Sequence, residues 1–294
     1  LNTSAIFGFC NSLLEVINNH EPTHLGVVFD PPGGSNREDI FTEYKANRQE
    51  MPEDIRKAIP YIFEILKAMN IQVEMISGFE ADDLIGTLSK QAEKKGFKVF
   101  MMTPDKDFGQ LVSENIFIYK PGRSGNPSEI LGPNEVCEKF EVERPEQVID
   151  ILGLWGDAVD NIPGIPGIGE KTAKKLIGIY GSIENLLANT GDLKGKQKEN
   201  VENFADQGLI SKKLATIILD CPVEFNESIY KRKEIDEKPL TGILKELEFN
   251  QLGKRILGKP IYQEKQMDLF ASSENEAEST TNLQDFSSTK TDYK

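Results

Sequence analysis

Short apolar segments alternate with helical patterns through the first half of this 294-residue chain, and this alternation constrains the fold more than any other feature. Apolar segments predict strands at 24–29, 71–76, 97–102 and 116–119. Amphipathic spacing predicts helices at 5–17, 39–47, 52–69, 81–95 and 107–112. Chains in which helices separate successive strands form α/β domains. We therefore predict an α/β domain with a mainly parallel sheet flanked by helices over residues 1–150.

The second half of the chain has a different pattern. From residue 133 onward the spacing is helical, with one further strand predicted near 222–225. We expect a helical domain over residues 151–260. Residues 261–294 are polar and poor in apolar side chains, a composition that predicts a disordered linker.

Two classes of protein are excluded by composition. No apolar run approaches the roughly 18–20 residues that a membrane helix needs, so we expect no membrane-spanning segment. The three cysteines, Cys10, Cys137 and Cys221, are odd in number and far apart in sequence. They form neither a disulfide framework nor a zinc motif, which favours a reducing cytoplasm.

The net charge of −14 argues at first against a nucleic-acid partner, because proteins that bind phosphates are usually basic. The excess acid is not evenly spread, however. Residues 1–150 carry 15 Lys and Arg against 25 Asp and Glu, whereas residues 151–260 carry 16 of each. If the acids of the first domain hold divalent metals, they form a neutralised site and do not repel DNA. Net acidity therefore does not exclude a DNA substrate.

Carboxylates follow three successive predicted strands. They are Asp30 after the first strand, Glu80, Asp82 and Asp83 after the second, and Asp105 and Asp107 after the third. Ligands of open α/β sheets gather beyond the carboxyl ends of the strands, and carboxylate oxygens suit Mg²⁺ or Mn²⁺. Two such ions about 4 Å apart orient a water and stabilise the leaving oxygen of a phosphodiester. The alternative, that these acids cap helices, suits a single Asp83 or Asp107 better than three clusters in register.

A glycine-rich segment follows two further acids, Asp157 and Asp160, which share one face if that stretch is helical. Residues 162–169 contain two prolines and three glycines interspersed with isoleucine, and they lead into a helix near Lys171 and Thr172. Glycines let backbone N–H groups approach a phosphate, and a helix N-terminus favours negative charge. The pattern is typical of a hairpin that grips one DNA strand without reading bases. An ordinary turn between helices is the alternative.

Five motifs occur in a fixed order: VVFD at 27–30, YKANR at 44–48, GFEADD at 78–83, TPDKD at 103–107 and GDAVDNIPGIPGIGEKT at 156–172. Together they resemble the 5′-nuclease domain of bacterial DNA polymerase I, within the flap endonuclease family. The resemblance covers about residues 1–260. It implies a PIN-like α/β core, a helix–three-turn–helix subdomain, and a two-metal phosphodiesterase that removes 5′ flaps and RNA primers.

The resemblance also implies roles for residues. Metal ligands would be Asp30, Glu80 and Asp82 for a first Mg²⁺ or Mn²⁺, and Asp105, Asp107 and Asp157 for a second, with Asp83 and Asp160 nearby or acting through water. Lys45 and Arg48 match the helical arch, at about residues 33–58, and would contact the scissile phosphate. Duplex backbone would be held by Gly164, Gly167, Gly169, Lys171 and Thr172, often with a potassium ion.

Two features depart from the family pattern. Members begin with a strand whose Asp is a ligand of the first metal, and this strand would precede Leu1. We expect a chain without it to be less stable and much less active than one that restores it. Residues 33–36, Gly-Gly-Ser-Asn, also differ from the commoner entry to the arch, which leaves the arch conformation open.

The tail contains QMDLF at 266–270. This resembles the short peptide by which bacterial replication proteins bind the sliding clamp. Leu269 and Phe270 would enter an apolar groove, and Gln266 would accompany them. A chance pentapeptide, or a strip packed on the domain, is the alternative.

The sequence thus favours a monomeric, metal-dependent 5′-nuclease from the bacterial cytoplasm, acting at the nucleoid on duplex DNA with a 5′ flap or nick. We expect further exonuclease-like and polymerase domains beyond residue 294. One alternative is a DNA-binding module without catalysis, but such a module gains nothing from eight mutually repelling acids. Another is a metal phosphohydrolase for small phosphates, which the hairpin at 162–172 disfavours.

Overall fold

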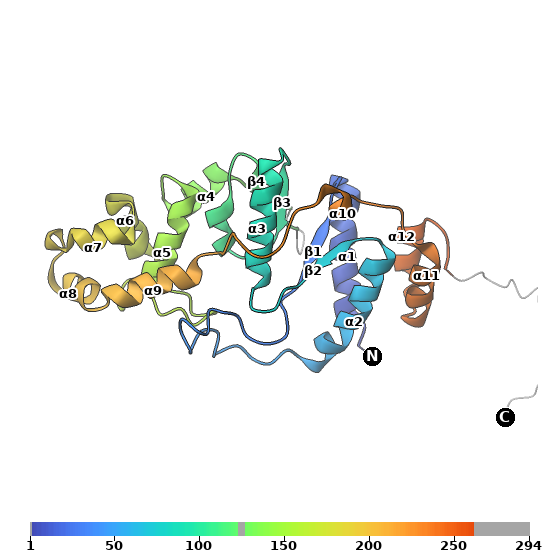
Figure 1. The fold of residues 1–294 in the computed structure, drawn as a ribbon, viewed down its shortest axis with the longest axis horizontal. Helices are drawn as coiled ribbons and strands as arrows, with labels where there is room; N and C mark the ends of the chain where they lie inside the picture. The colour runs from blue at the N-terminus through green and yellow to red at the C-terminus, as the bar shows by residue number, and fades with distance from the viewer. Residues whose placement is uncertain (1, 123–126, 262–294) are drawn as a thin grey trace, which may run out of the picture.

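Two small sheets lie in the middle of the molecule (Figure 1). The computed structural model describes residues 2–122 and 127–261. In one sheet, β1 (Gly26–Val28) pairs in parallel with β2 (Gln72–Glu74). In the other, β4 (Ile116–Lys120) lies between β3 (Val99–Met102), which is parallel to it, and β5 (Glu129–Leu131), which is antiparallel. The four predicted strands are present, and β5 is an additional strand that the sequence did not predict.

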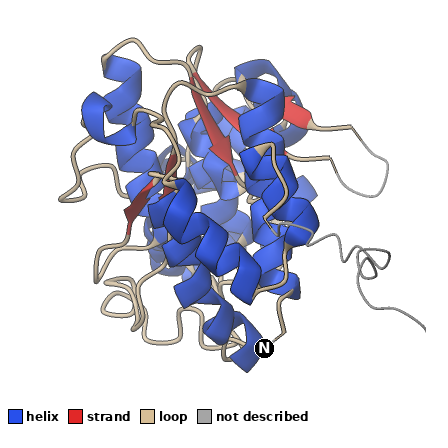
Figure 2. Cartoon of the chain, turned by 90° about the vertical axis from the view of Figure 1, so that its right-hand side faces the viewer, coloured by secondary structure: helices blue, strands red, loops and turns tan. Residues whose placement is uncertain are grey.

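The helices of the first half join the two sheets. They are α1 (Ser4–His20), α2 (Glu53–Ala68), α3 (Ala81–Lys94) and the 3₁₀ helix η1 (Asp107–Leu111). The central one is α3, which contacts β1 in the first sheet and β3 and β4 in the second. Seen from the side, the strands lie among the helices (Figure 2). A helix that bridges both sheets therefore holds the α/β core together.

Helices make up the second half of the described chain. They are α4 (Pro133–Phe140), η2 (Pro145–Gln147), α5 (Val148–Trp155), α6 (Glu170–Tyr180), α7 (Ile183–Ala188), η3 (Thr190–Asp192), α8 (Gly195–Asn203), α9 (Ala205–Ala215), α10 (Glu227–Tyr230), α11 (Glu237–Glu246) and α12 (Asn250–Leu257). The first group, α5 to α9, packs together at one end of the molecule (Figure 1). At the opposite end, α11 packs on both α2 and α12. The chain thus returns to its first half after the helical subdomain.

Two apolar cores support this arrangement. One runs from Phe108 and Ile116 through Ile151 to Ile177 and Leu214, so it continues across residue 150 without a break. The other packs α1 and α2 against α11 and α12. At roughly 25 cal/mol for each Å² of apolar surface removed from water, burial of side chains such as these is the main stabilising contribution. The boundary between α/β and helical parts near residue 150 stays a prediction.

Two predicted elements are wrong. Residues 39–47 form successive turns and not a helix, with Lys45 in the left-handed region at φ 57°. Residues 222–225 form no strand, because the Phe225 N–H donates to the Gln91 side chain at 2.7 Å and not to a neighbouring strand. In both places, contacts with residues distant in sequence determine the backbone conformation. The predicted linker, apart from Ile261, lies outside the described residues, and the described helices include none that is long and apolar enough to span a membrane.

Candidate metal centre

Acids that follow β1 and β2 meet at the N-terminus of α3. Asp30 follows β1, and its Oδ1 accepts the N–H of Ala81, the first residue of α3, at 2.8 Å. Glu80 immediately precedes α3, and Asp82 lies in its first turn. The carboxyl end of β1 and the start of α3 are therefore tied together by a carboxylate, as the sequence predicts for parallel strands that share one edge.

Asp82 lies among acids of all three predicted clusters. The pKa of its carboxyl group is raised to about 7, mainly by burial and also by the neighbouring carboxylates of Asp105, Glu80 and Asp30, whereas Lys45 lowers it. These electrostatic interactions require the acids after β1, β2 and β3 to lie within reach of one another. The three clusters thus converge.

Asp107 belongs to the same group of acids and links it to the acids after α5. Burial, followed by the charges of Asp105, Asp157 and Asp160, raises its pKa to about 8, whereas Lys106 lowers it. Its backbone N–H donates to Asp105 Oδ1 at 2.9 Å. Its own Oδ1 is buried and, within the described residues, has no hydrogen-bond partner. A buried carboxylate oxygen without a donor is costly, and coordination of a hard divalent cation would satisfy it.

The two acids after α5 reach this group from a turn and not from a helix. Asp157 and Ile162 exchange backbone hydrogen bonds at 2.9 and 2.8 Å and close the turn between them. Asp157 Oδ1 also accepts the N–H of Val159 at 2.8 Å. Residues 157–160 are therefore not helical, so Asp157 and Asp160 do not share a helix face, although the turn still directs both toward the acids of the core.

Cationic side chains surround the carboxylates. Lys45 Nζ lies 2.6 Å from Glu80 Oε2 and 3.7 Å from Asp160 Oδ2. Arg48 Nη2 lies 2.7 Å from Asp160 Oδ1. The Lys45 backbone N–H also donates to the Asp160 carbonyl at 2.9 Å, so the loop 36–48 is attached to the turn 157–162. The structure thus brings together the two predicted phosphate-contacting residues and the predicted metal-binding acids.

Three further side chains belong to this site, although the sequence pattern assigns them no role: Lys106, Tyr44 and Arg37. Lys106 Nζ forms an ion pair with Asp157 and stands between two predicted ligands, a position that could have identified it. Tyr44 is buried, and its hydroxyl donates to Glu80 Oε2 at 3.2 Å. Tyr44 precedes Lys45 in its motif, which is the only sequence signal for it.

Asp83 does not fit the predicted set of metal ligands. Its side chain is fully buried, and both oxygens accept hydrogen bonds from the guanidinium of Arg37 at 2.7 Å. Oδ1 also accepts the N–H of Ile218, and Oδ2 that of Glu80. With its acceptor positions filled, Asp83 is an ion-pair partner and a helix cap, and we remove it from the candidate ligands.

The remaining acids provide the oxygen ligands that a hard divalent cation prefers. All donors are carboxylate oxygens, and one of them, Asp107 Oδ1, is buried without a donor. Within residues 2–122 and 127–261, no group of three or more His, Cys, Asp or Glu side chains is close enough together to hold a metal ion as the chain stands. Lys45 and Lys106 supply the positive charge at Glu80 and Asp157 in this arrangement.

The glycine-rich segment forms the predicted turn before α6, but its glycines differ in role. Gly164 is buried, its N–H donates to Ser211 Oγ at 3.0 Å, and its carbonyl accepts a bond from Gln207 at 2.6 Å. Its backbone is therefore not free to bind a phosphate, contrary to the prediction. Gly167 and Gly169 are exposed in front of α6. Lys171 is exposed and Thr172 partly so, and both lie in the first turn of that helix.

Gly164 instead allows two backbones to approach closely, and Gly164→Ala is expected to destabilise the protein. A Cβ there would lie 2.5 Å from the Gly156 nitrogen and 2.5 Å from the Trp155 carbonyl carbon, at a φ of +61°. Since backbone atoms cannot move aside, we expect a loss of about 2–4 kcal/mol in the free energy of unfolding, measured with urea. The control is Gly242→Ala, at an exposed position inside α11 with open space around it, which we expect to stabilise the protein by about 0.5–1 kcal/mol. Equal stability of the two variants would contradict this account of Gly164.

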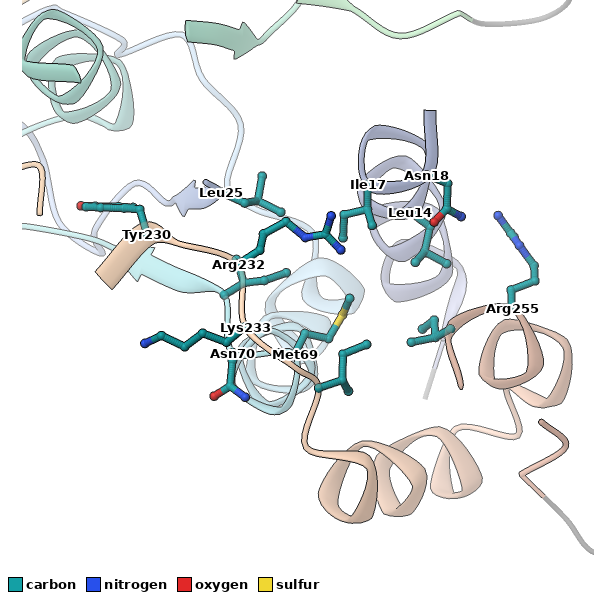
Figure 3. A pocket seen from close by; sticks show the side chains of 13 residues that line it. Leu14, Ile17, Asn18, Leu25, Met69, Asn70, Tyr230, Arg232, Lys233 and Arg255 are labelled. Carbon is teal, nitrogen blue, oxygen red and sulfur yellow. The ribbon is translucent and has the colours of Figure 1, made fainter. Parts of the chain in front are cut away.

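A cavity of about 150 Å³ lies away from the acids (Figure 3). It is bounded by α1, the end of α2, the segment 230–235 and α12. Its walls combine apolar side chains such as Leu14 and Met69 with the cations Arg232, Lys233 and Arg255. None of the predicted site residues lines it, so the candidate centre is defined by convergent charges and not by a deep pocket.

Two family descriptions match consecutive parts of the chain. Residues 1–141 match the 5′-3′ exonuclease N-terminal resolvase-like domain, and residues 143–238 match the 5′-3′ exonuclease C-terminal SAM fold. The first match covers β1 to β5 and the second covers α5 to α10.

Curated relatives agree with this assignment. A 5′-3′ exonuclease of Aquifex aeolicus is 39% identical over 272 residues, which are 91% of this chain and 90% of the relative. DNA polymerase I of Bacillus subtilis is 40% identical over 257 residues, which are 87% of this chain and 29% of that protein. The chain thus spans less than a third of the length of the polymerase relative.

Solved structures support the fold. The T5 D15 protein co-crystallized with metal ions superposes with a TM-score of 0.62 at 19% identity, covering 87% of this chain and 92% of that one. The catalytic core of Rad2 in complex with DNA substrate gives a TM-score of 0.55 at 16% identity, with 89% and 81% covered. The predicted architecture, a PIN-like α/β core followed by a helical subdomain, is confirmed. With both of its halves matched in order, the chain belongs to the 5′-3′ exonuclease family.

Proposed function

We propose that this chain is a divalent-metal-dependent 5′-3′ exonuclease and 5′-flap endonuclease that hydrolyses phosphodiesters of DNA and of RNA primers. The observation that carries the proposal is the convergence of carboxylates from four separate segments beside Lys45 and Arg48. They include the buried oxygen of Asp107 that has no hydrogen-bond partner among the described residues. A module that only binds DNA has no use for such a concentration of buried negative charge.

The acids would hold two ions, Mg²⁺ or Mn²⁺. Candidate ligands are Asp30, Glu80 and Asp82 for one ion, and Asp105, Asp107 and Asp157 for the other, with Asp160 next to them. When bound, such ions lower the pKa of a water and stabilise negative charge on a leaving oxygen. Glu80 and Asp157 would exchange their present ammonium partners, Lys45 and Lys106, for these cations.

The chain's own cations would then be available to the substrate. Lys45 and Arg48 are held at the acids by Asp160, which pairs with both side chains. A phosphate that enters beside the acids would meet an ammonium and a guanidinium already in place, and the guanidinium suits a planar, two-point contact with phosphate oxygens. We assign these two side chains the neutralisation and orientation of the scissile phosphate.

The turn before α6 would hold the DNA backbone. Gly167, Gly169 and Lys171 present backbone N–H groups, a helix N-terminus and one cation to solvent. The N–H of Thr172 donates to the Gly169 carbonyl at 3.0 Å, so Thr172 would contribute its hydroxyl. A potassium ion at this turn, which the family resemblance implies, would use backbone carbonyls of the turn. The Pro166 carbonyl accepts one bond from Asn200 at 2.7 Å and keeps a second lone pair for such an ion. Gly164 would attach the turn to α9 through its hydrogen bonds with Ser211 and Gln207.

We extend the proposal to the protein's surroundings. The match to DNA polymerase I relatives supports a parent chain that also carries polymerase activity. Such an enzyme would act as a monomer in the bacterial cytoplasm, at nicks and 5′ flaps of the nucleoid. The polymerase, the monomeric state and the location are each open to test on the full-length protein.

A 5′-labelled flap duplex tests the function. We expect cleavage near the junction with Mg²⁺ or Mn²⁺, and none with EDTA. Binding of the flap without cleavage in any metal would favour the alternative of a non-catalytic DNA-binding module. Hydrolysis of small phosphate esters without binding of the duplex would instead favour a small-molecule phosphohydrolase.

The clamp motif lies outside the described residues and is proposed from its sequence. Replacing Leu269 and Phe270 by Ala is expected to weaken binding of a bacterial sliding clamp by at least about tenfold, because side chains of this kind act as anchors in a groove. Surface plasmon resonance on immobilised clamp would measure the effect, with flap cleavage in the absence of clamp as the control. Equal clamp affinity of the two proteins would show that QMDLF is a chance match.

A further inference from the structure

Arg37 is a buried cation that the proposed chemistry does not use. It is only 5% exposed, in a loop whose neighbours are mostly exposed. Its side chain makes four hydrogen bonds to residues distant in sequence: two to Asp83, one to the carbonyl of Leu214 and one to that of Thr216. A side chain that makes four hydrogen bonds to two other segments fixes the position of these segments relative to each other.

On one side, Arg37 acts on the acids through Asp83. The guanidinium holds both Asp83 oxygens at 2.7 Å, and Asp83 Oδ2 accepts the N–H of Glu80 at 3.1 Å. Arg37 Nη1 also lies 3.7 Å from Glu80 Oε2. The backbone and the carboxylate of Glu80 therefore both depend on where Arg37 lies.

Arg37 also caps the C-terminus of α9 by donating to its last carbonyls. The Leu214 carbonyl accepts from Nε at 3.0 Å and the Thr216 carbonyl from Nη2 at 2.8 Å. Carbonyls at a helix C-terminus lack intrahelical partners, and a cation is favoured there. The same helix supports the hairpin, because Gln207 and Ser211 bond the backbone of Gly164. One rigid helix thus runs from the hairpin to Arg37.

We propose that Arg37 is a positioning residue that sets the register between the DNA-holding hairpin and the carboxylates that act on the scissile phosphate. This inference rests on the proposed function. Arg37 joins three segments: its own loop, which continues to Lys45; the N-terminus of α3; and the C-terminus of α9. Lysine cannot take its place, because an ammonium does not present the planar fork that holds Asp83 and two carbonyls together.

A purely structural role predicts different behaviour. A buried ion pair is often replaced by apolar side chains without loss of stability. If the pair only fills space, a variant with apolar residues at both positions should regain stability and activity together. If Arg37 sets the register, the apolar pair should regain stability alone.

The experiment compares the wild-type chain with Arg37→Lys and with the double variant Arg37→Met/Asp83→Leu. Measurements are thermal unfolding, Mn²⁺ affinity by electron paramagnetic resonance, kcat and KM on a 5′-labelled flap duplex, and the distribution of cleavage positions around the junction. The control is Arg255→Lys, an exposed arginine on α12 that bonds Asn11 at the far end of the molecule.

We expect Arg37→Lys to lower kcat and Mn²⁺ affinity by about 10–100-fold, as loss of a group that orients metal ligands does, with KM changed less than about threefold. Cleavage should spread to phosphodiesters next to the wild-type position. The double variant should melt within a few degrees of the wild type and keep the kinetic and metal-binding defects, while Arg255→Lys behaves as wild type.

Wild-type Mn²⁺ affinity and a single cleavage position in either folded variant would overturn the proposal. Loss of the fold in both variants would also overturn it, because Arg37 would then have a structural role only. If the wild-type chain itself neither binds Mn²⁺ nor cleaves the flap, the proposed function fails before Arg37 is tested.

Discussion

Asp107→Asn is expected to lower kcat for flap cleavage by about 10²–10³-fold at saturating Mg²⁺, the loss typical when an electrostatic group of an active site is removed. The substitution keeps the size of the side chain but removes the charge from the buried Oδ1, the oxygen that has no donor in the described structure. It also removes repulsion from Asp105, Asp157 and Asp160, the carboxylates that raise the pKa of Asp107.

The same variant therefore separates function from stability. In EDTA above pH 8, where the Asp107 carboxyl is ionised because its pKa is about 8, we expect Asp107→Asn to melt at the same temperature as the wild type or above it, because a buried and mutually repelling charge has been removed. Single-turnover cleavage and thermal unfolding measure the two effects. Asp220→Asn, at an exposed acid, is the control and should change neither. Wild-type cleavage by Asp107→Asn would remove Asp107 from the metal ligands.

Lys45→Ala is expected to lower kcat by a similar factor, about 10²–10³-fold, with a smaller change in KM. The ammonium lies between Glu80 and Asp160, and the Lys45 backbone is fixed to the Asp160 carbonyl, so the charge is delivered to the acids with little freedom. In the absence of metal, the variant leaves Glu80 without its nearest cation and should melt at a lower temperature than the wild type. Added Mg²⁺ should reduce that difference.

The control for Lys45 is Lys57→Ala. Lys57 lies on the exposed side of α2 and pairs with Glu53 one turn earlier, a contact worth little in water. Burst and steady-state cleavage of the flap duplex separate kcat from KM. If Lys45→Ala cleaves as fast as Lys57→Ala, the loop 36–48 does not take part in the reaction as proposed.

Much of the core could be predicted from sequence because local pattern and tertiary environment agree there. The apolar runs that became β1 to β4 are too short for buried helices and are flanked by amphipathic helical spacing. Acids follow the first three of these runs, and the parallel pairing of β1 with β2 places the acids after those two strands at one edge. The third cluster follows β3 in the other sheet, and α3, which contacts both sheets, joins it to the first two. The interactions of Asp82 with Asp30, Glu80 and Asp105 follow from this arrangement.

The loop 36–48 could not be predicted, because long-range contacts determine it. Its spacing is compatible with a helix, but the buried guanidinium of Arg37 bonds residues 46, 177 and 179 positions away. Those bonds, together with the attachment of Lys45 to Asp160, favour successive turns over a continuous helix. The same bonds explain Asp83, which has the sequence context of a metal ligand but the contacts of an ion-pair partner.

Contacts distant in sequence also determine the backbone conformation around the hairpin. Asp157 and Asp160 have helical spacing, yet backbone pairing of Asp157 with Ile162 closes a turn there. The sequence context of Gly164 predicts a phosphate-binding glycine, but its N–H and carbonyl are hydrogen-bonded to side chains of α9. Trp155 and Gly156 also leave no room for a Cβ at this position. A single sequence does not reveal which glycine faces a ligand and which faces another backbone.

The central claim is that acids from separate segments share divalent cations at one place, and anomalous diffraction from crystals grown with Mn²⁺ tests it most directly. We predict manganese peaks within coordination distance of the Asp82 and Asp107 carboxylates, with Lys45 no longer paired to Glu80. Manganese absent from these acids, or bound singly on different faces while Lys45 and Lys106 keep their present partners, would contradict the account.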